Sequence, residues 1–327
     1  FLGTAAGKPS KDRNVTSIAI ELEDNEYILI DCGESTQHQI LKSKLKFNKL
    51  NSIFITHLHG DHVFGLPGLL STINEYRVND LIIHGPVGIG KFVNHFLNGP
   101  YSNIGNYKII IKEYDKKYNN LCEIVCRRNV YKIESCFVKH REFCYAYKIT
   151  QTEIFSKIDI KKIDPILKEN KEEILKLGFN PIYKIIDKLK RDKEVKLENV
   201  HLKLDDFDFP KNKLSLLICL DNCDITDVLA FFKKCDILVH ECTYIIEENF
   251  EKEIYEKAIL YGHSTNRMAA QNAVKLNAQN LILTHFSNKY EIDKGKMIIE
   301  SHLLNDTTKY FFDKIFCAYD FSEFNLC

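Results

Sequence analysis

The chain has 327 residues, of which 45% are hydrophobic, so it can bury a large core and suits one large α/β domain or two fused halves. Its 45 Lys and Arg balance its 45 Asp and Glu, which excludes a global positive field and leaves nucleic-acid binding to a local patch. No apolar run reaches the roughly 18 residues of a membrane span, so we expect no membrane partner.

The 11 cysteines are odd in number and scattered, and none forms a Cys-x-x-Cys pair. This pattern indicates buried thiols in a reducing, intracellular compartment, and a second zinc site is the alternative. Which compartment holds the protein stays open.

Short apolar runs rich in Ile, Leu and Val recur along the chain and predict buried strands. They lie at residues 51–56, 80–85, 214–220, 235–241 and 280–285. Helical spacing of apolar residues predicts helices between the strands, with caps at Thr226 and at Ser264 or Thr265. These helices lie at residues 68–76, 226–233 and 265–276. The alternation predicts an α/β fold.

Residues 151–198 interrupt this alternation because they are highly charged and poor in strand signals, so we interpret them as an insertion. From Lys157 to Lys196 the chain has 12 Lys and Arg against 8 Asp and Glu, a net charge of +4. A solvated helix face is one explanation, and a surface for RNA phosphates is the other.

The stretch GPVGIGKF, residues 85–92, matches the Gly-x4-Gly-Lys part of a phosphate-binding loop. Phe92, however, stands where such a loop needs Ser or Thr for magnesium. We therefore expect a simple turn from a strand to a helix.

Histidines and aspartates stand at the ends of the predicted strands, where open α/β sheets place their sites. A single histidine in such a place is as often a hydrogen-bonded filler as a ligand. Several of them together with acidic residues indicate a metal site. The group comprises His57, Asp61, His140, Asp221, His240 and His285.

The stretch FITHLHGDHVFGLPG, residues 54–68, indicates two metal positions. His57 and His59 can point to one side of a turn that Gly60 permits, and Asp61 and His62 then face a second point. In His-Glu-x-x-His, by contrast, both histidines share one helix face and one ion. Imidazole and carboxylate favour zinc, with manganese or iron as alternatives.

The candidate ligands divide plausibly between the two ions, with room for a shared hydroxide. The division is His57, His59 and His140 for the first ion, Asp61, His62 and His285 for the second, and Asp221 as the bridge. Such a pair can activate water and hold a phosphodiester in line.

The pattern His-x-His-x-Asp-His with a distant His, Asp and His resembles the metallo-β-lactamase superfamily. Further segments are similar to those of ribonuclease Z, the tRNA 3′-processing endonuclease. They are FLGTAAGKPSKDRN, DCGESTQHQI, HLHGDHVFGLPGLL, HECTY, GHST and LTHFSNKY, so that the likeness runs from Phe1 to about Tyr290. This chain departs from the family in having Asn222 after Asp221 and Cys242 in HECTY, and its insertion lacks a clear Gly-Pro element.

The resemblance implies a single domain over residues 1–327, folded as an αββα sandwich of the metallo-β-lactamase type, with an arm at 151–198 that binds tRNA. It implies a zinc-dependent endoribonuclease that removes the 3′ trailer of precursor tRNA and works as a homodimer. The alternatives are another superfamily hydrolase, such as a phosphodiesterase, and a non-catalytic RNA-binding relative.

The resemblance also implies roles for particular residues. By resemblance His263, steadied by Glu241, would protonate the departing oxygen, whereas the motif itself places Asp61 to orient an external hydroxide as general base. Attack by that hydroxide would leave a 3′-OH on the tRNA and a 5′-phosphate on the trailer. The alternative for His263 is a buried histidine at a helix start. The expected RNA contacts are Lys11, Arg13 and Asn14 near the RNA 3′ end and Lys184, Lys188, Lys190 and Arg191 in the arm.

Overall fold

The computed structural model describes residues 1–98, 105–115, 121–126, 129–153, 158–207, 214–246, 250–291, 300–311 and 314–325. The chain divides into two compact units. We call the larger one the body (Phe1–Ile124, Lys132–Thr150 and Leu214–Cys327) and the smaller one the inserted unit (Val125–Tyr131 and Gln151–Lys213). The insertion that we expected at 151–198 falls in the inserted unit, which continues to Lys213.

The first sheet of the body has five strands in the order β2-β3-β4-β5-β6. Only the β2–β3 pair is antiparallel. Apolar side chains of the strands and of the helices beside them form one buried cluster. The elements are β2 (Ile18–Glu21), β3 (Tyr27–Ile30), β4 (Leu50–Phe54), β5 (Leu81–Pro86), β6 (Ile109–Tyr114), α1 (Thr36–Lys42), α2 (Gly60–Val63), α3 (Leu66–Ile73) and α4 (Ile89–Leu97).

The second sheet has seven strands in the order β16-β14-β13-β12-β9-β8-β7. Strands β12, β13, β14 and β16 are parallel, and β9 is antiparallel to β12. The strands are β7 (Leu121–Cys126), β8 (Asn129–Val138), β9 (Cys144–Glu153), β12 (Ser215–Cys219), β13 (Ile237–Glu241), β14 (Asn280–Thr284) and β16 (Lys314–Cys317). The helices that lie between β12 and β16 in the chain are α9 (Thr226–Phe231), α10 (Glu251–Tyr261), α11 (Asn266–Lys275) and α12 (Glu300–Thr308).

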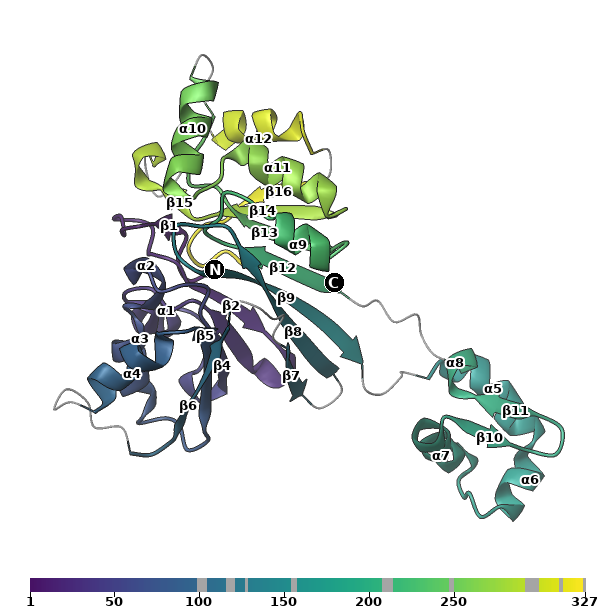
Figure 1. Cartoon of the computed structure of the whole chain (residues 1–327). Coiled ribbons are helices and arrows are strands. Elements are labelled where there is room, and N and C mark those ends of the chain that lie inside the picture. Colours follow the sequence, from purple (N-terminus) through teal and green to yellow (C-terminus); the bar gives the residue numbers. More distant parts are fainter. Residues whose placement is uncertain are drawn as a thin grey trace. The chain divides into compact units, whose positions relative to one another are not determined.

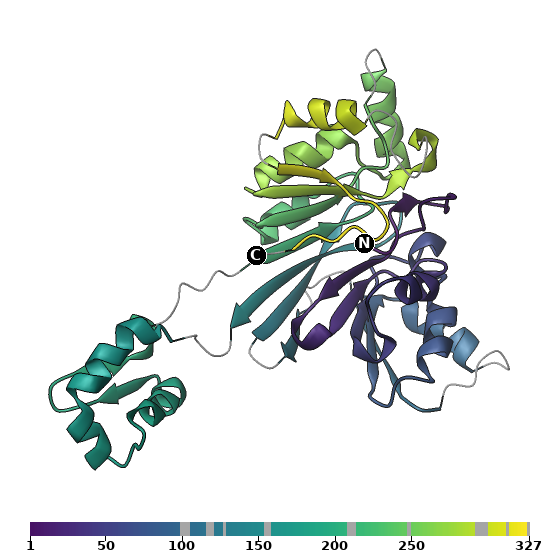
Figure 2. The same ribbon diagram turned by 180° about the vertical axis from the view of Figure 1, so that it is seen from behind.

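The two sheets of the body face each other. The Phe54 and Tyr147 rings meet edge to face at 5.5 Å, and the Tyr147 hydroxyl donates to the Ile55 carbonyl at 2.6 Å. Figures 1 and 2 show helices on the outer faces of both sheets, with α1, α3 and α4 on one side and α9, α11 and α12 on the other. This is the αββα sandwich that the resemblance implied.

All five predicted strands are present, as β4, β5, β12, β13 and β14. The three predicted helices are α3, α9 and α11, and the Thr265 hydroxyl accepts the Met268 N–H as a cap of α11. Thr226 is not a cap, because it is the first helical residue and Asp224 accepts its N–H at 2.7 Å. The predicted turn at 85–92 leads into α4, and Glu113 accepts the Gly88 and Gly90 N–H groups there, which leaves no open anion site.

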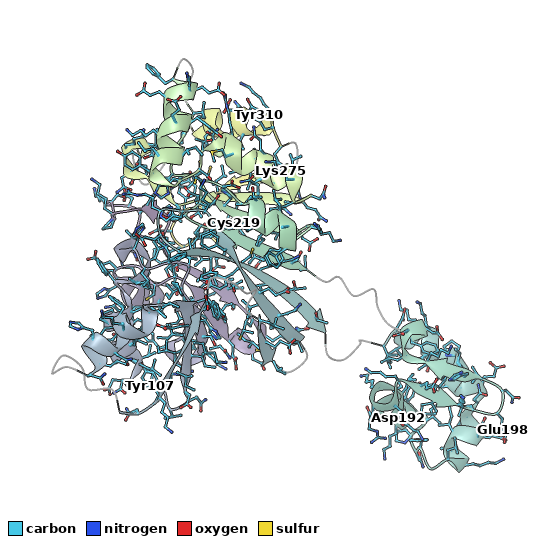
Figure 3. All side chains as sticks on the ribbon, in the orientation of Figure 1. Tyr107, Asp192, Glu198, Cys219, Lys275 and Tyr310 are labelled. Carbon is cyan, nitrogen blue, oxygen red and sulfur yellow. The ribbon has the colours of Figure 1, made fainter. Side chains whose placement is uncertain are left out.

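The inserted unit has its own small core, so it is more than a charged helix. Its buried side chains include Ile163, Leu167, Ile174, Ile185, Leu189 and Leu202. Figure 3 shows charged side chains over the rest of it, among them Asp192 and Glu198. Its elements are α5 (Ile160–Glu169), α6 (Lys171–Lys176), α7 (Ile185–Asp192), α8 (Leu204–Phe207), and the strands β10 (Glu194–Lys196) and β11 (His201–Lys203), which form a hairpin.

Within the described residues, no helix has both the length and the apolar character to cross a membrane. The ten cysteines in this part of the chain are all free, and nine of them are buried. None of them belongs to a cluster of potential metal ligands among the residues that the structure describes. The nine buried ones are thiols packed in the interior, Cys122 is half-buried, and Cys327 lies outside the described residues.

Candidate metal centre

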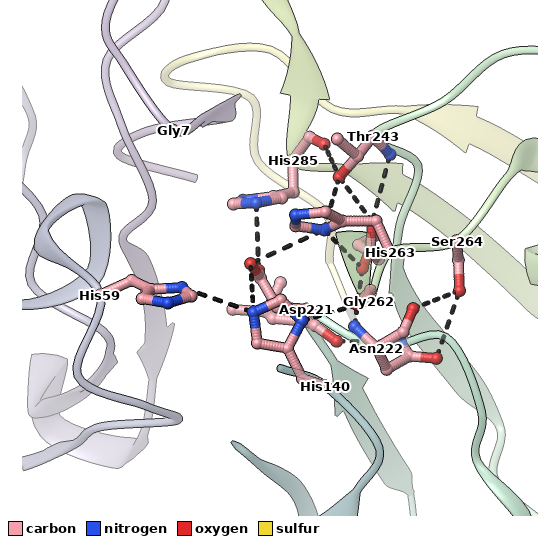
Figure 4. Close-up of polar contacts among 12 residues, drawn as sticks. Gly7, His59, His140, Asp221, Asn222, Thr243, Gly262, His263, Ser264 and His285 are labelled. Atoms are coloured by element: carbon pink, nitrogen blue, oxygen red, sulfur yellow. Dashed lines mark hydrogen bonds and ion pairs between the residues drawn. The ribbon is translucent and has the colours of Figure 1, made fainter. Parts of the chain in front are cut away.

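Side chains from the ends of four strands and from α2 meet in the body. Figure 4 shows four of them, which are His59, His140, Asp221 and His285. His57 and His59 follow β4, His140 follows β8, Asp221 follows β12 and His285 follows β14. Asp61 and His62 lie on the short helix α2. Thus all seven predicted ligands lie together, although they come from positions up to 228 residues apart.

The first group of ligand atoms surrounds a point beside β4 and β8. The His59 Nδ1 atom lies 2.9 Å from His57 Nε2 and 3.4 Å from His140 Nε2. Asp221 Oδ2 lies 3.7 Å from His57 Nε2 and 3.8 Å from His140 Nε2. Three nitrogens and one oxygen therefore face one another at spacings that suit a tetrahedral ion.

The second group uses the other oxygen of the same aspartate. Asp221 Oδ1 lies 3.0 Å from His285 Nε2 and 3.3 Å from His62 Nε2. The Asp61 Oδ2 atom lies 3.4 Å from His62 Nε2 and accepts the Gly7 N–H at 2.7 Å. Asp221 thus presents one oxygen to each group, which is the geometry of a bridging ligand.

The second group contains buried polar atoms that lack hydrogen-bond partners. These atoms are His62 Nε2, Asp221 Oδ1 and His285 Nε2. Leaving such atoms unsatisfied in a protein interior is costly, and they are rare in native structures. A cation between them would satisfy all three, so the residues present fit a bound metal.

The electrostatics of the centre also favour a cation. Burial, the largest influence, raises the pKa of Asp221, but His285, His62 and His57 outweigh it and lower that pKa well below the usual value. Burial lowers the pKa of His57 well below the usual value, which keeps its imidazole in the neutral form that binds metals. At His62 burial lowers the pKa, but the carboxylates of Asp221, Asp61 and Asp31 outweigh it and raise the value. A metal ion would replace the proton that this excess of negative charge attracts.

The outer nitrogen of several ligand rings is held by a fixed partner. His140 Nδ1 lies 2.6 Å from the Gly262 carbonyl, and His285 Nδ1 lies 2.7 Å from the Thr16 hydroxyl. His62 Nδ1 lies 2.6 Å from Asp31 Oδ2. A partner on Nδ1 leaves Nε2 free to bind metal and fixes the ring orientation.

Asp31, which is not among the predicted residues, contacts side chains of both groups. It is fully buried and accepts the Thr56 N–H and the Thr56 hydroxyl, each at 2.7 Å. The same hydroxyl lies 3.1 Å from His57 Nδ1, so Asp31 contacts His62 directly and His57 through Thr56. Its position directly after the apolar run 27–30 was the available signal, because Asp221 was found by the same criterion.

His263 lies beside the metal ligands and next to an acidic partner. Its Nδ1 atom lies 3.1 Å from Glu241 Oε1, 3.3 Å from the Thr243 hydroxyl and 3.7 Å from Asp221 Oδ2. Burial lowers the pKa of His263, but Glu241 and Asp221 outweigh it and raise that pKa to about 9. The raised pKa favours the protonated ring, and the side chain is 18% exposed, so His263 is not a fully buried histidine.

His240 ends a strand as the ligands do, yet it points away from the centre. Its Nε2 atom lies 3.0 Å from the Asn272 amide nitrogen, and Nδ1 lies 2.8 Å from the Glu241 carbonyl. It is a satisfied core histidine. Asn222, where this chain departs from the family pattern, donates its N–H to Glu241 at 2.6 Å and so ties the Asp221 loop to the partner of His263.

The three residues expected near the RNA 3′ end differ in exposure. Lys11 is exposed and Asn14 is half-buried. The expectation for Arg13 is corrected, because its side chain is 1% exposed and donates to the Thr4 hydroxyl and to the Ala318 carbonyl. Its guanidinium also lies over the Phe286 and Tyr319 rings, so Arg13 joins the two ends of the chain and does not face solvent.

The basic residues expected in the inserted unit lie on or beside α7. Lys184 and Arg191 are exposed, whereas Lys188 and Lys190 are half-buried. The opposite face of α7 contributes Ile185 and Leu189 to the small core. The basic face is available to solvent, and its contact with RNA stays a prediction.

Comparisons with known proteins identify the family and the fold of the chain. The Ribonuclease Z of Prochlorococcus marinus (strain MIT 9312) is 35% identical over 316 residues, which cover 95% of this chain and 94% of the relative. The crystal structure of human tRNase Z, short form, has a TM-score of 0.63 at 24% identity and covers 100% of this chain and 98% of that one. The metallo-beta-lactamase fold protein YhfI from Bacillus subtilis has a TM-score of 0.59 at 14% identity, with 98% and 95% covered. A family model described as Anti-Pycsar protein Apyc1 matches residues 1–179.

Proposed function

Because the chain belongs to the ribonuclease Z family, it is an endoribonuclease that processes the 3′ end of tRNA, and we propose that two zinc ions serve it at the centre described above. The observation that carries this proposal is Asp221, which presents one carboxylate oxygen to each group of histidines. The first ion would be held by His57, His59 and His140, and the second by Asp61, His62 and His285. Manganese or iron could occupy the same donor set.

A bound pair of zinc ions would supply an activated water and would neutralise charge on the phosphodiester. Asp61 faces the centre and is held there by the Gly7 N–H, so we propose that its carboxylate orients the attacking water and receives its proton. Because the nucleophile is water and not the RNA 2′-OH, the tRNA keeps a 3′-OH and the trailer leaves with a 5′-phosphate.

We propose that His263 is the general acid of the reaction. Glu241 accepts from the His263 ring on the side away from solvent, which keeps the imidazole protonated and oriented. The proton passes to the 3′ oxygen of the tRNA as the bond to phosphorus breaks. This step removes the charge that would otherwise develop on the leaving oxygen.

We further propose that the inserted unit binds the tRNA body. Its exposed basic residues, with Lys184 and Arg191 among them, would contact backbone phosphates and not base edges. A homodimer, in which each inserted unit serves its partner's substrate, is part of the same proposal. Sedimentation of the purified protein tests that part.

Substitution of His59 tests the centre. His59→Ala removes an imidazole from the first group, so we expect loss of precursor cleavage and binding of fewer metal ions than the roughly two expected per chain. Elemental analysis and mapping of the cleaved RNA ends measure both effects. The matched control is His38→Ala, which changes an exposed histidine of α1 and should retain both precursor cleavage and metal content. Full activity in His59→Ala would reject the dinuclear centre.

A comparison of substrates separates this activity from another phosphodiesterase activity. Precursor tRNA and a small aryl phosphodiester should both be cleaved, and a chelator should stop both reactions. Cleavage of the aryl substrate alone would point to a small-molecule phosphodiesterase. Binding of tRNA with no cleavage of either substrate would point to a non-catalytic relative.

A further inference from the structure

An exposed apolar patch borders the metal centre. We call it the rim patch, and it consists of Leu58, Phe64, Val87 and Phe92. Leu58, Phe64 and Val87 are 37%, 62% and 66% exposed, and Phe92 is half-buried. The Phe64 and Phe92 rings are stacked with their centroids 6.5 Å apart and their planes 23° apart. Leu58 lies in the loop before α2, Phe64 directly follows α2, Val87 lies in the turn before α4 and Phe92 lies on α4.

The rim patch is continuous with the turn that carries the ligands. A methyl group on Gly60 would lie 2.3 Å from Phe64 Cε2, so the ring folds back against the backbone between His59 and Asp61. Gly60 does not have a positive φ, so the turn between His59 and Asp61 does not use a left-handed backbone, and the Phe64 ring covers the place where a larger residue would have its side chain. Leu58 lies between two ligands in the sequence, and its Cδ1 atom would be 3.0 Å from a methyl group on Gly88.

We propose that the rim patch stacks an unpaired nucleobase of the substrate RNA, next to the phosphate that is cleaved. The proposal rests on the function given above. An RNA strand that places one phosphate at Asp61 and His62 continues covalently past the adjoining surface, and its bases are its flat apolar parts. Phe64 offers an exposed aromatic face there, and Lys91, next to Phe92 on α4, is exposed and can contact a neighbouring phosphate.

Base stacking on an aromatic side chain is tolerant of base identity and typically contributes roughly 5- to 150-fold in affinity. The rim patch would therefore help to position unpaired RNA of any sequence at the scissile bond. It contains no group that reads a base edge, so it would not select a particular nucleotide.

The test combines protein variants with precursor tRNA that lacks single bases. An abasic nucleotide replaces, in turn, each of the two nucleotides on either side of the cleaved bond. On the intact substrate, Phe64→Ala should raise KM on the order of 10-fold, and Phe64→Trp should keep it near the original value. On one abasic substrate, Phe64→Ala should have no further effect, because the base that stacks is already missing. Phe231→Ala, an exposed phenylalanine of α9 that is 56% exposed, is the matched control.

Other results would overturn the proposal in recognisable ways. An equal effect of Phe64→Ala on every abasic substrate would exclude stacking. Loss of bound metal in Phe64→Ala would show that the ring supports the ligand turn, and a change from dimer to monomer in sedimentation would show that the rim patch joins two copies of the chain. Failure of the unmodified, metal-loaded protein to cleave any precursor tRNA would reject the proposed function itself, and the stacking with it.

Discussion

Asp31 is a single carboxylate on which ligands of both metal positions depend. In Asp31→Asn one oxygen becomes an NH2 group, which cannot accept from the His62 ring and the Thr56 hydroxyl. We expect metal affinity to fall about 10- to 100-fold while the protein remains folded. Competition with a chelator measures this, with the exposed Asp115→Asn as control. Unchanged affinity would limit Asp31 to a role in folding.

His263 can be separated from the ligands by experiment although it lies close to them. His263→Ala should lower the single-turnover rate on precursor tRNA about 10²- to 10⁴-fold, since proton transfer typically contributes that much. Metal content should stay the same. Because His263 Nδ1 is 3.7 Å from Asp221 Oδ2, loss of metal in the variant would instead identify it as a ligand. A normal rate would make it structural.

At the scale of elements, a charged contact joins α11 to α12 behind the second sheet. Arg267 donates to both oxygens of Asp306 at 2.7 and 2.9 Å, and Asn266 donates to Asp306 at 3.0 Å. Asp306→Asn should lower the free energy of unfolding by about 2 kcal/mol, the typical contribution of hydrogen bonds to a charged group. Denaturant titration measures this. As a control, Glu256→Gln removes the exposed ion pair between Lys252 and Glu256 on α10. This change should lower the free energy of unfolding by less than about 0.5 kcal/mol.

The same contact predicts a dependence of stability on pH. Burial raises the pKa of Asp306, but hydrogen bonds from Arg267 and Asn266 outweigh it, so the pKa is lower in the folded chain than in the unfolded chain. The Asp306 carboxylate therefore makes its full contribution to the free energy of unfolding above the pKa that it has in the unfolded chain. This contribution is lost as the pH falls through the pKa that Asp306 has in the folded chain. The stability difference between the original chain and Asp306→Asn should narrow in acid. If the stability difference between the two proteins stays constant with pH, the contact does not depend on the charge of Asp306.

At the scale of the whole molecule, the two units allow chemistry to be separated from substrate binding. Changing Lys188, Lys190 and Arg191 together to Ala should raise KM for precursor tRNA more than it lowers kcat, and should reduce the salt dependence of binding, because fewer phosphates are neutralised. The metal ligands lie in the body and should be unaffected. The matched control changes Lys161, Lys162 and Lys171 to Ala, which removes the same charge from the inserted unit but from α5 and α6 in place of α7. Unchanged tRNA kinetics in the first variant would leave α7 as a solvated helix face.

The strands and several of the candidate ligands were predictable because they depend on local pattern. Apolar runs of strand length predicted β4, β5, β12, β13 and β14, and a histidine or aspartate after such a run selected His57, Asp221 and His285, which the structure brings together. The same criterion, applied alone, also selected His240, which is a satisfied core histidine. A residue at a strand end can point to either face, and a single sequence does not specify which.

Local sequence by itself determined which side chains have the chemistry for this site, because donor type and spacing are properties of the chain. Tertiary structure alone decided which of them meet. It buried Arg13 between the two ends of the chain and connected Asp31 to two candidate ligand histidines. Each of these contacts joins backbone segments whose approach is set by packing of the whole body. Residue type and spacing determine the chemistry that a side chain can perform, whereas packing determines which side chains it contacts.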